Sequence, residues 1–170
     1  MGEYEEKAVR ERRTQVLIGE LQGLAPDVVA LNEANKLPRY GRRLGEARKM
    51  LAFIERVAGD RPAILLGDFN ALPDREEIAM LLQAGFVDAV AVAGSSEGIT
   101  WDEERNANIQ LRRRTYPEEI PQDPRNKRID YVFVRSSGLS VTRAMVVLDR
   151  PIEGLYPSDH FGVLVKIAVR

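Results

Sequence analysis

Two short apolar runs in this chain each end in acidic and amide side chains. Residues 27–31 (DVVAL) are followed by Asn32 and Glu33, and residues 63–66 (AILL) lead into the segment from Gly67 to Asn70 (GDFN). Short, continuous apolar runs rich in branched residues favour strands that are buried on both faces. The sequence therefore predicts two buried strands whose polar ends lie at the edge of the core.

Helical patterns alternate with these strands. Apolar residues recur amid charge from about Tyr4 to Leu24, and a second such pattern ends near Ala58. A third helix is expected to begin at Asp74 as its N-cap, with Glu76 and Glu77 in a first turn where the helix dipole favours acids. Helices that alternate with buried strands predict an α/β domain.

The second half of the chain has a different pattern. Residues 86–92 fit a short strand or a loop edge, and residues 94–127, rich in Gly, Ser, Asn, Pro and charge, predict a long surface loop. Three adjacent strands are then expected, separated by turn residues: 128–134 (RIDYVFV), 140–148 and 160–169. We interpret residues 1–170 as one α/β domain with mixed β-sheets flanked by helices.

Composition excludes several kinds of chemistry. Lys and Arg total 25 against 26 Asp and Glu, so no global positive field marks a dedicated nucleic-acid binder. The chain has no Cys, which excludes disulfides, thiolate zinc sites and cysteine nucleophiles. A functional site must therefore use oxygen and nitrogen ligands.

The acids have positions that allow them to converge. Glu33, Asp68 and Asn70 follow the first two strands, whereas Asp130 and the pair Asp159-His160 stand where late strands begin. If the two sets of strands run antiparallel, all these groups share one edge. Carboxylates brought together repel one another unless a cation compensates them. Oxygen ligands with a single His suit Mg²⁺ or Mn²⁺ and the hydrolysis of phosphate esters.

Three segments in this order resemble the endonuclease/exonuclease/phosphatase superfamily, which includes deoxyribonuclease I and neutral sphingomyelinases. They are GDFNALPD at 67–74, RIDYVFV at 128–134 and SDHFG at 158–162. The resemblance extends from about Pro26 to the C-terminus. It implies the four-layer α/β sandwich of deoxyribonuclease I and a Mg²⁺-dependent hydrolase in which water attacks phosphorus in line.

The resemblance also implies roles for single residues. Glu33 would be the principal metal ligand, and Asp159 would be the late acid near the metal. Asp68 would orient or deprotonate the attacking water, and Asn70 would bond a phosphoryl oxygen. His160, oriented by Asp130, would contact the phosphate or act as the base. The resemblance does not determine whether Asp68 or His160 takes the proton of the attacking water.

The chain departs from the family pattern in two regions. Family members usually begin with a strand that carries a metal-site Asn, and they have further strands between the Gln-Glu strand and GDFN. Here Asn32 replaces that Gln, and both the first strand and a central block are missing. The sequence thus supports an alternative function, a catalytically incomplete family remnant that binds a phosphorylated ligand or partner.

Candidate substrate-binding residues lie in and after the predicted long loop. Trp101 would form a wall of the pocket or pack in the core, and Asn106 and Arg128 are further candidates. An ion pair with Arg128 is the alternative to the catalytic-support role of Asp130. From Arg105 to Arg128 the chain has seven Lys or Arg and three acids, an excess that would attract a polyanion. Three substrate classes stay open: a small phosphodiester, a lipid headgroup and a nucleic acid.

The sequence contains no apolar run of the roughly 20 residues that a transmembrane helix needs. Its first residues are charged rather than signal-like. A cytoplasmic location is the default expectation, with a signal peptide removed from a precursor as the alternative. The pattern of residues does not indicate an oligomeric state.

Overall fold

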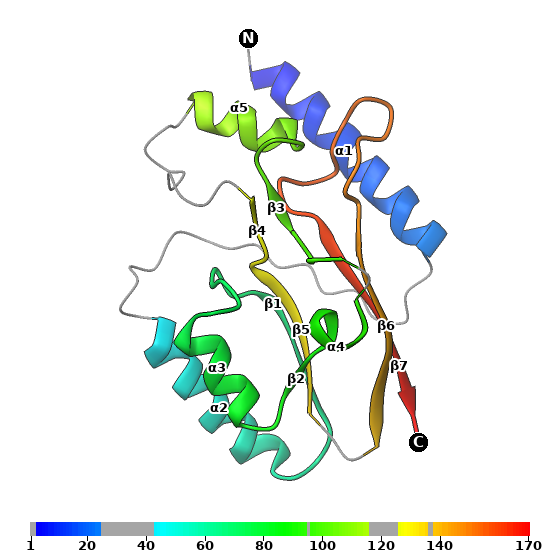
Figure 1. The fold of residues 1–170 in the computed structure, drawn as a ribbon. Coiled ribbons are helices and arrows are strands. Elements are labelled where there is room, and N and C mark those ends of the chain that lie inside the picture. The colour runs from blue at the N-terminus through cyan, green and yellow to red at the C-terminus, as the bar shows by residue number, and fades with distance from the viewer. Residues whose placement is uncertain (1–2, 25–42, 95, 116–125, 136–137) are drawn as a thin grey trace.

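The computed structural model describes residues 3–24, 43–94, 96–115, 126–135 and 138–170 (Figure 1). The strand predicted at 27–31, and with it Glu33, lies outside these described residues. None of the described helices is both long enough and apolar enough to cross a membrane.

The three predicted helices are confirmed with small shifts at their ends. They are α1 (Glu3–Leu24), α2 (Arg43–Ala58) and α3 (Glu76–Gln83). The predicted N-cap of α3 is corrected: Arg75 rather than Asp74 occupies that position, and it makes no side-chain capping bond. Glu76 and Glu77 do occupy the first turn, where their negative charges interact favourably with the positive end of the helix dipole.

A three-stranded antiparallel sheet lies at the centre of the molecule. Its order is β1 (Ala63–Asp68), β5 (Asp130–Arg135) and β2 (Val87–Asp88). Successive side chains of a strand point to opposite faces. Tyr131 and Phe133 of β5 therefore pack with residues of α2 and α3, whereas Val132 and Val134 pack on the opposite side. Both faces of the central strand are buried.

An antiparallel hairpin covers the second face of β5. It consists of β6 (Leu139–Val147) and β7 (Gly162–Val169), whose alternate apolar residues join Val132 and Val134 in one core cluster. Helix α1 lies along the β6–β7 connection, where Arg12 pairs with Glu153 at 2.8 Å (Figure 1). Two helices, a sheet and a hairpin are thus stacked in layers, and the predicted α/β class with sheets flanked by helices is confirmed.

The exposure of β1 corrects one expectation. Ile64 and Leu66 are 48% and 40% exposed, although the apolar run suggested a strand buried on both faces. Ala63 and Leu65 pack towards α2 and α3 as expected. Hydrophobic character alone predicts that a strand is in a sheet, and it does not determine whether a second layer covers that strand.

The prediction of one long loop over residues 94–127 is wrong for the residues of this range that the structure describes. This region contains β3 (Trp101–Asp102), α5 (Ala107–Thr115) and β4 (Asn126–Lys127), and β3 pairs antiparallel with β4. Trp101 and Ile109 form a small core with Ile129, so a few apolar side chains order a mostly polar segment. Similarly, only Val87–Asp88 of the range 86–92 is strand, and α4 (Ala89–Ala93) follows with Asp88 as its N-cap.

Candidate active site

The turn after β1 fixes the orientation of Asp68. Gly67 and Asn70 have positive φ angles of 142° and 49°, which Gly and Asn adopt more readily than other residues. In this turn the backbone N–H of Asn70 donates to Oδ1 of Asp68 at 2.7 Å, and its side-chain Nδ2 donates to Oδ2 at 2.8 Å. The residue types of the GDFN segment therefore follow from the geometry that it adopts.

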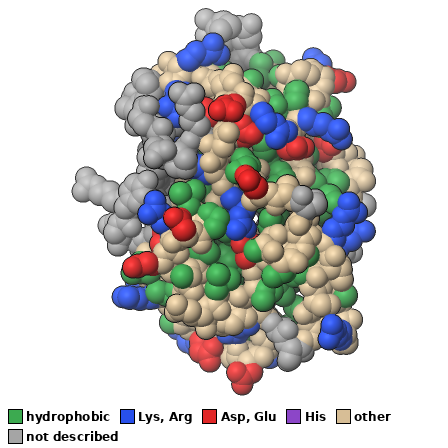
Figure 2. All heavy atoms as spheres, in the orientation of Figure 1, with side chains coloured by type: hydrophobic (Ala, Val, Ile, Leu, Met, Phe, Trp, Pro, Cys, Tyr) green, Lys and Arg blue, Asp and Glu red, His purple; other side chains and the backbone are tan. Residues whose placement is uncertain are grey.

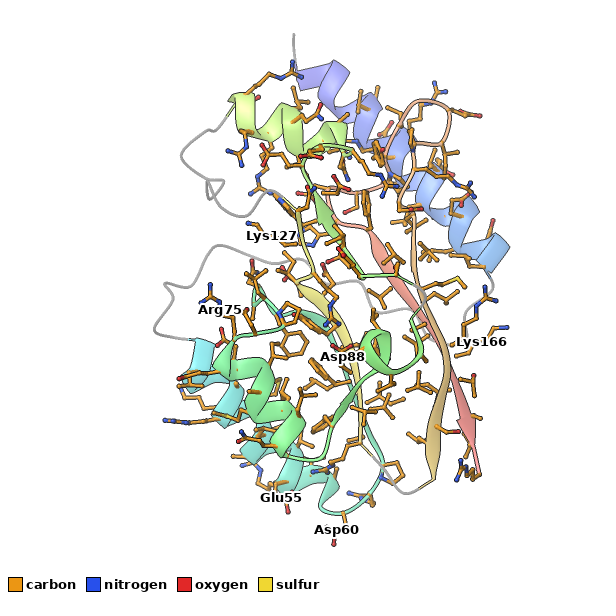
Figure 3. All side chains as sticks on the ribbon, viewed as in Figure 1. Glu55, Asp60, Arg75, Asp88, Lys127 and Lys166 are labelled. Carbon is orange, nitrogen blue, oxygen red and sulfur yellow. The ribbon has the colours of Figure 1, made fainter. Side chains whose placement is uncertain are left out.

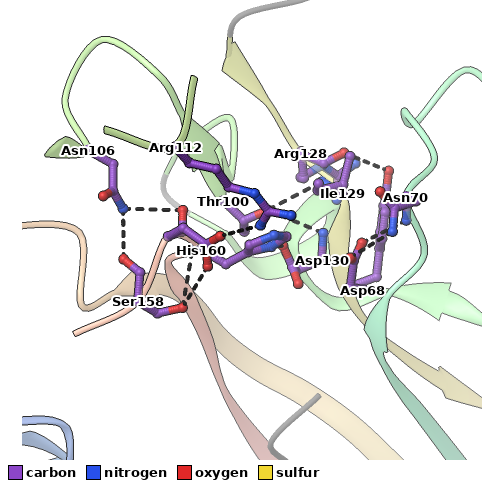
Figure 4. A network of polar contacts seen from close by, with 12 residues as sticks. Asp68, Asn70, Thr100, Asn106, Arg112, Arg128, Ile129, Asp130, Ser158 and His160 are labelled. Carbon is purple, nitrogen blue, oxygen red and sulfur yellow. Dashed lines mark hydrogen bonds and ion pairs between the residues drawn. The ribbon is translucent and has the colours of Figure 1, made fainter. Parts of the chain in front are cut away.

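Asp130 lies opposite Asp68 in the ladder between β1 and β5. The pairing continues one residue further, where the N–H of Phe69 donates to the carbonyl oxygen of Ile129 at 2.8 Å. Because the two strands are antiparallel, the last residue of β1 and the first residue of β5 share one edge of the sheet (Figure 4). Two acids far apart in sequence are thus brought together by strand register.

His160 lies two residues before the start of β7, and its side chain reaches the same edge of the sheet. Its Nδ1 lies 2.9 Å from Oδ2 of Asp130, and the two side chains are 25% and 19% exposed. The ring of Trp101 meets the imidazole edge-on, with 5.0 Å between ring centroids. Asp68, Asn70, Asp130 and His160 therefore converge as the sequence predicted, from three separate segments (Figure 4).

The surroundings of His160 raise its pKa above the ordinary value of 6.5. Burial lowers the pKa, because it disfavours the imidazolium. The hydrogen bond to Asp130 and the negative charges of Asp130, Asp68 and Asp159 raise it, and together they outweigh burial. The protonated imidazole therefore persists to a higher pH than in an isolated histidine.

Asp130→Asn is expected to lower the pKa of His160, because the variant removes the carboxylate that contributes most to the upward shift. His160 is the single His of the chain, so an NMR titration of its ring protons reads this pKa directly. Asp60→Asn, at an exposed acid before β1 (Figure 3), is the matched control and should leave the titration unchanged.

The sign of the linked stability effect follows from the raised pKa. The ion pair stabilises the fold fully below pH 6.5, and this contribution is lost as the pH rises through the folded-state pKa of His160. Asp130→Asn should therefore destabilise the protein more at mildly acidic pH than above that pKa. An unchanged His160 titration in Asp130→Asn would rule out Asp130 as the cause of the shift.

A comparison with known protein families decides where the chain belongs. The sequence profile of the Endonuclease/Exonuclease/phosphatase family matches residues 7–160. The chain belongs to this family. No curated protein matches the sequence.

Solved structures share the fold of this family member. D. rerio TDP2 complexed with single-strand DNA product is 22% identical, with a TM-score of 0.59 over 79% of this chain and 53% of that one. An endonuclease/exonuclease/phosphatase family protein from Leptotrichia buccalis C-1013-b is 26% identical, with a TM-score of 0.51 over 72% and 41% of the two chains. The human Nocturnin catalytic domain with bound sulfate anion is 20% identical, with a TM-score of 0.52 over 79% and 44%. The chain spans about half the length of these structures.

Asp159, the late acid of the family motif, pairs with a cation of the chain itself. Arg112 of α5 lies 3.2 Å from its Oδ2, and the hydroxyl of Ser158 lies 3.3 Å from its Oδ1. Within the described part of the chain, no group of three or more His, Asp or Glu side chains stands close enough to hold a metal ion. Asp68 and Asp159 offer oxygen ligands suited to Mg²⁺, and Glu33 lies outside the described residues.

The three candidate substrate residues lie in different surroundings. Trp101 is buried, and its indole nitrogen has no hydrogen-bond partner among the described residues. Asn106 is fully buried, and its Nδ2 donates to the carbonyl oxygens of Ser158 and Asp159 at 2.9 and 3.2 Å, which holds the loop before His160. Arg128 pairs with Asp88 rather than with Asp130, and both side chains are almost buried.

Two further residues support the site and were not predicted from the sequence. Thr100, next to Trp101, is fully buried and bonds the backbone at the start of β5. The hydroxyl of Tyr131 donates to the carbonyl oxygen of Ala71 at 2.8 Å, which anchors the turn after Asp68, and burial raises its pKa well above 10. The RIDYVFV segment contained Tyr131, but its hydroxyl partner was not visible in a linear pattern.

Proposed function

We propose that this protein is a metal-dependent phosphoric ester hydrolase in which water attacks phosphorus in line. The observation that carries the proposal is the convergence of Asp68 and the Asp130–His160 pair at one edge of the sheet. A carboxylate fixed by two hydrogen bonds and an imidazole fixed by a second carboxylate are the groups that acid and base catalysis requires. Family membership supports this class of reaction.

The bond to Asp130 determines which nitrogen of His160 is available for catalysis. When Nδ1–H donates to Asp130, Nε2 is the nitrogen that meets the substrate. A protonated Nε2 donates to a phosphoryl oxygen, and a neutral one accepts the proton of the attacking water. The raised pKa of His160 extends the first of these roles to higher pH than an ordinary imidazole allows, and where His160 is protonated Asp68 is the better placed base.

Asp68 and Asn70 act together in this scheme. The carboxylate of Asp68 takes a proton from water as the oxygen of that water forms its bond to phosphorus and the ester oxygen leaves. Nδ2 of Asn70 uses one N–H for Asp68, and an amide nitrogen carries a second N–H, which would donate to a phosphoryl oxygen. Negative charge that develops on the phosphoryl oxygens is thereby stabilised by a fixed donor.

Glu33 and Asp159 are the proposed ligands of Mg²⁺ or Mn²⁺. A bound divalent cation would supply Lewis-acid stabilisation of the phosphoryl oxygens. The support for this cation is chemical, because several carboxylates at one edge repel one another without a compensating charge. Asp159 already takes a positive partner, Arg112, in the described part of the chain.

The substrate is proposed only as a phosphate ester. The TDP2 structure holds a single-strand DNA product and the Nocturnin structure a sulfate anion, so the fold accommodates both kinds of anion in those proteins. On the face shown in Figure 2, the described Lys and Arg side chains are interspersed with Asp and Glu and form no continuous basic stripe. A small phosphodiester, a lipid headgroup and a nucleic acid are therefore all compatible with the proposal.

A chromogenic diester tests the proposal directly. Bis(p-nitrophenyl) phosphate should be hydrolysed with Mg²⁺ or Mn²⁺, and the activity should disappear with EDTA and return when the metal is restored in excess. Activity that is unaffected by EDTA would exclude the metal. A complete lack of hydrolysis with every divalent metal would instead favour the alternative function.

The alternative is a catalytically incomplete family remnant that binds a phosphorylated ligand or partner. The observation that favours it is the pairing of Asp159, a proposed metal ligand, with Arg112 at 3.2 Å. Calorimetry with Mn²⁺ alone and with inorganic phosphate separates the two functions in an inactive protein. Binding of phosphate without turnover supports the remnant, and the absence of both kinds of binding excludes it.

A further inference from the structure

Thr100 is the residue through which the two halves of the candidate site are joined. It is fully buried. Its Oγ1 accepts hydrogen bonds from the backbone N–H groups of Ile129 and Asp130, each at 3.2 Å. Its own N–H donates to the carbonyl oxygen of Lys127 at 2.9 Å, and its carbonyl oxygen accepts from the N–H of Phe161 at 2.7 Å.

These bonds reach the backbone on both sides of the catalytic contact. On one side Thr100 bonds the N–H of Asp130 itself (Figure 4), and on the other its carbonyl oxygen accepts from the residue that follows His160. The side chains of Asp130 and His160 meet at 2.9 Å between these two anchored points. Thr100 also precedes Trp101, whose ring contacts the imidazole. A single buried residue therefore fixes three neighbours of the contact.

We propose that Thr100 is a positioning residue that sets the Asp130–His160 hydrogen bond. The proposal rests on the proposed hydrolase function for its effect on catalysis, and its structural part stands without that function. The backbone bonds of Thr100 would form with any residue in this conformation, whereas the bonds of Oγ1 need a hydroxyl group. The contribution of the Thr100 hydroxyl group can therefore be tested by substitution.

A matched pair of variants isolates the hydroxyl group. Thr100→Val keeps the shape of the side chain and removes Oγ1, and Thr100→Ser keeps Oγ1 and removes only the methyl group. Without Oγ1, the N–H groups of Ile129 and Asp130 lose an acceptor, so the start of β5 shifts relative to His160. Thr142→Val, at an exposed hydroxyl of β6 that bonds the carbonyl oxygen of Lys166, is the control for removing a hydroxyl from a strand.

The first measurement does not depend on activity. The chain has one His, so the ¹⁵N shifts of its imidazole report which ring nitrogen carries the proton and whether Nδ1–H is hydrogen-bonded. Thr100→Val is expected to lose the signature of a bonded Nδ1–H, whereas Thr100→Ser and Thr142→Val should retain it. A folded Thr100→Val that keeps the wild-type ¹⁵N shifts overturns the proposal, whether or not the protein is a hydrolase.

The second measurement is the kinetics of bis(p-nitrophenyl) phosphate hydrolysis. Thr100→Val should lower kcat by about 10- to 100-fold with little change in KM, because a displaced catalytic group slows the chemical step more than it weakens binding. Thr100→Ser should restore most of kcat. Equal losses of kcat in the Ser and Val variants would contradict a role of the hydroxyl group.

Amide hydrogen exchange keeps the proposal testable if Thr100→Val does not fold. In the wild-type protein, the N–H groups of Ile129 and Asp130 should exchange as slowly as those inside β5. The same two amides should stay protected in Thr100→Ser. Rapid exchange at both positions in the folded wild-type protein would show that Oγ1 does not hold this backbone.

Discussion

His160→Ala is expected to lower kcat for metal-dependent phosphodiester hydrolysis by about 10²- to 10⁴-fold, the range that a positioned acid or base contributes. The imidazole is held at 2.9 Å from Asp130 and contacts Trp101, so its removal takes away a group that is fixed before substrate binds. KM should change less than kcat if His160 acts mainly on the transition state. Steady-state kinetics with bis(p-nitrophenyl) phosphate measure both constants.

Asp68→Asn is the companion variant, and it is expected to reduce kcat over a similar range. The substitution keeps the shape of the side chain and removes one negative charge and one proton acceptor. A new amide at this position also faces Nδ2 of Asn70, so the variant disturbs the Asp68–Asn70 pair as a unit. Asp60→Asn, at an exposed acid (Figure 3), is the matched control and should leave kcat unchanged.

The two variants also address which group takes the proton. If Asp68 is the base, Asp68→Asn should remove the acidic limb of the pH–rate profile, and His160→Ala should remove the alkaline limb. If His160 is the base, the acidic limb should instead disappear with His160→Ala. Activity within a few-fold of wild type in either variant would contradict the proposed role of that residue.

The edge that carries the site was predictable because its determinants are local. A strand that ends in Asp68 and a strand that begins with Asp130 share an edge once they pair antiparallel, whatever surrounds them. The Gly and Asn of GDFN similarly favour the turn that orients Asp68. Short patterns in the sequence locate the strand ends and the turn, whereas the antiparallel pairing of β1 with β5 was an assumption that the structure confirms.

The surroundings of the site were less predictable because they depend on contacts between distant segments. The polar composition of 94–127 indicated a loop, yet Trp101, Ile109 and Ile129 form a core that orders β3 and α5. The partner of Thr100 lies about 30 residues away along the chain. No local pattern of hydrophobicity indicates that a threonine hydroxyl will meet the start of a remote strand.

The ion-pair partner of Arg128 also depends on a contact between distant segments. The sequence allowed two partners for Arg128: Asp130, two residues away, and the substrate. The structure instead gives Arg128 the carboxylate of Asp88, at the junction of β2 and α4 beside β5 (Figure 3). Gly98 permits this packing, because a Cβ atom there would stand 2.7 Å from the Arg128 side chain.

Arg128→Met is expected to lower the free energy of unfolding by about 3–5 kcal/mol, the usual cost of leaving a buried charge without its partner. The side chains of Arg128 and Asp88 are only 10% and 5% exposed, and the guanidinium also lies 4.8 Å from the centre of the Tyr131 ring. Such a loss is large against the ~5–15 kcal/mol stability of a typical domain. Thermal unfolding should show a decrease in Tm of roughly 6–20 °C for a chain of this size.

Two variants separate this structural role from substrate binding. The double variant Asp88→Asn/Arg128→Met leaves no buried charge without a partner. In the wild-type protein Asp88 caps α4 by accepting from the N–H groups of Val90 and Ala91, and an Asn at this position can do the same. The double variant should therefore recover part of the lost stability. Arg12→Met breaks an exposed pair, with side chains 60% and 68% exposed, and should change stability by less than about 1 kcal/mol. An unchanged Tm in Arg128→Met, together with a raised KM, would instead assign Arg128 to the substrate. The buried pair with Asp88 makes the loss of stability the expected result, because a guanidinium held in that pair is already neutralised before any phosphate arrives.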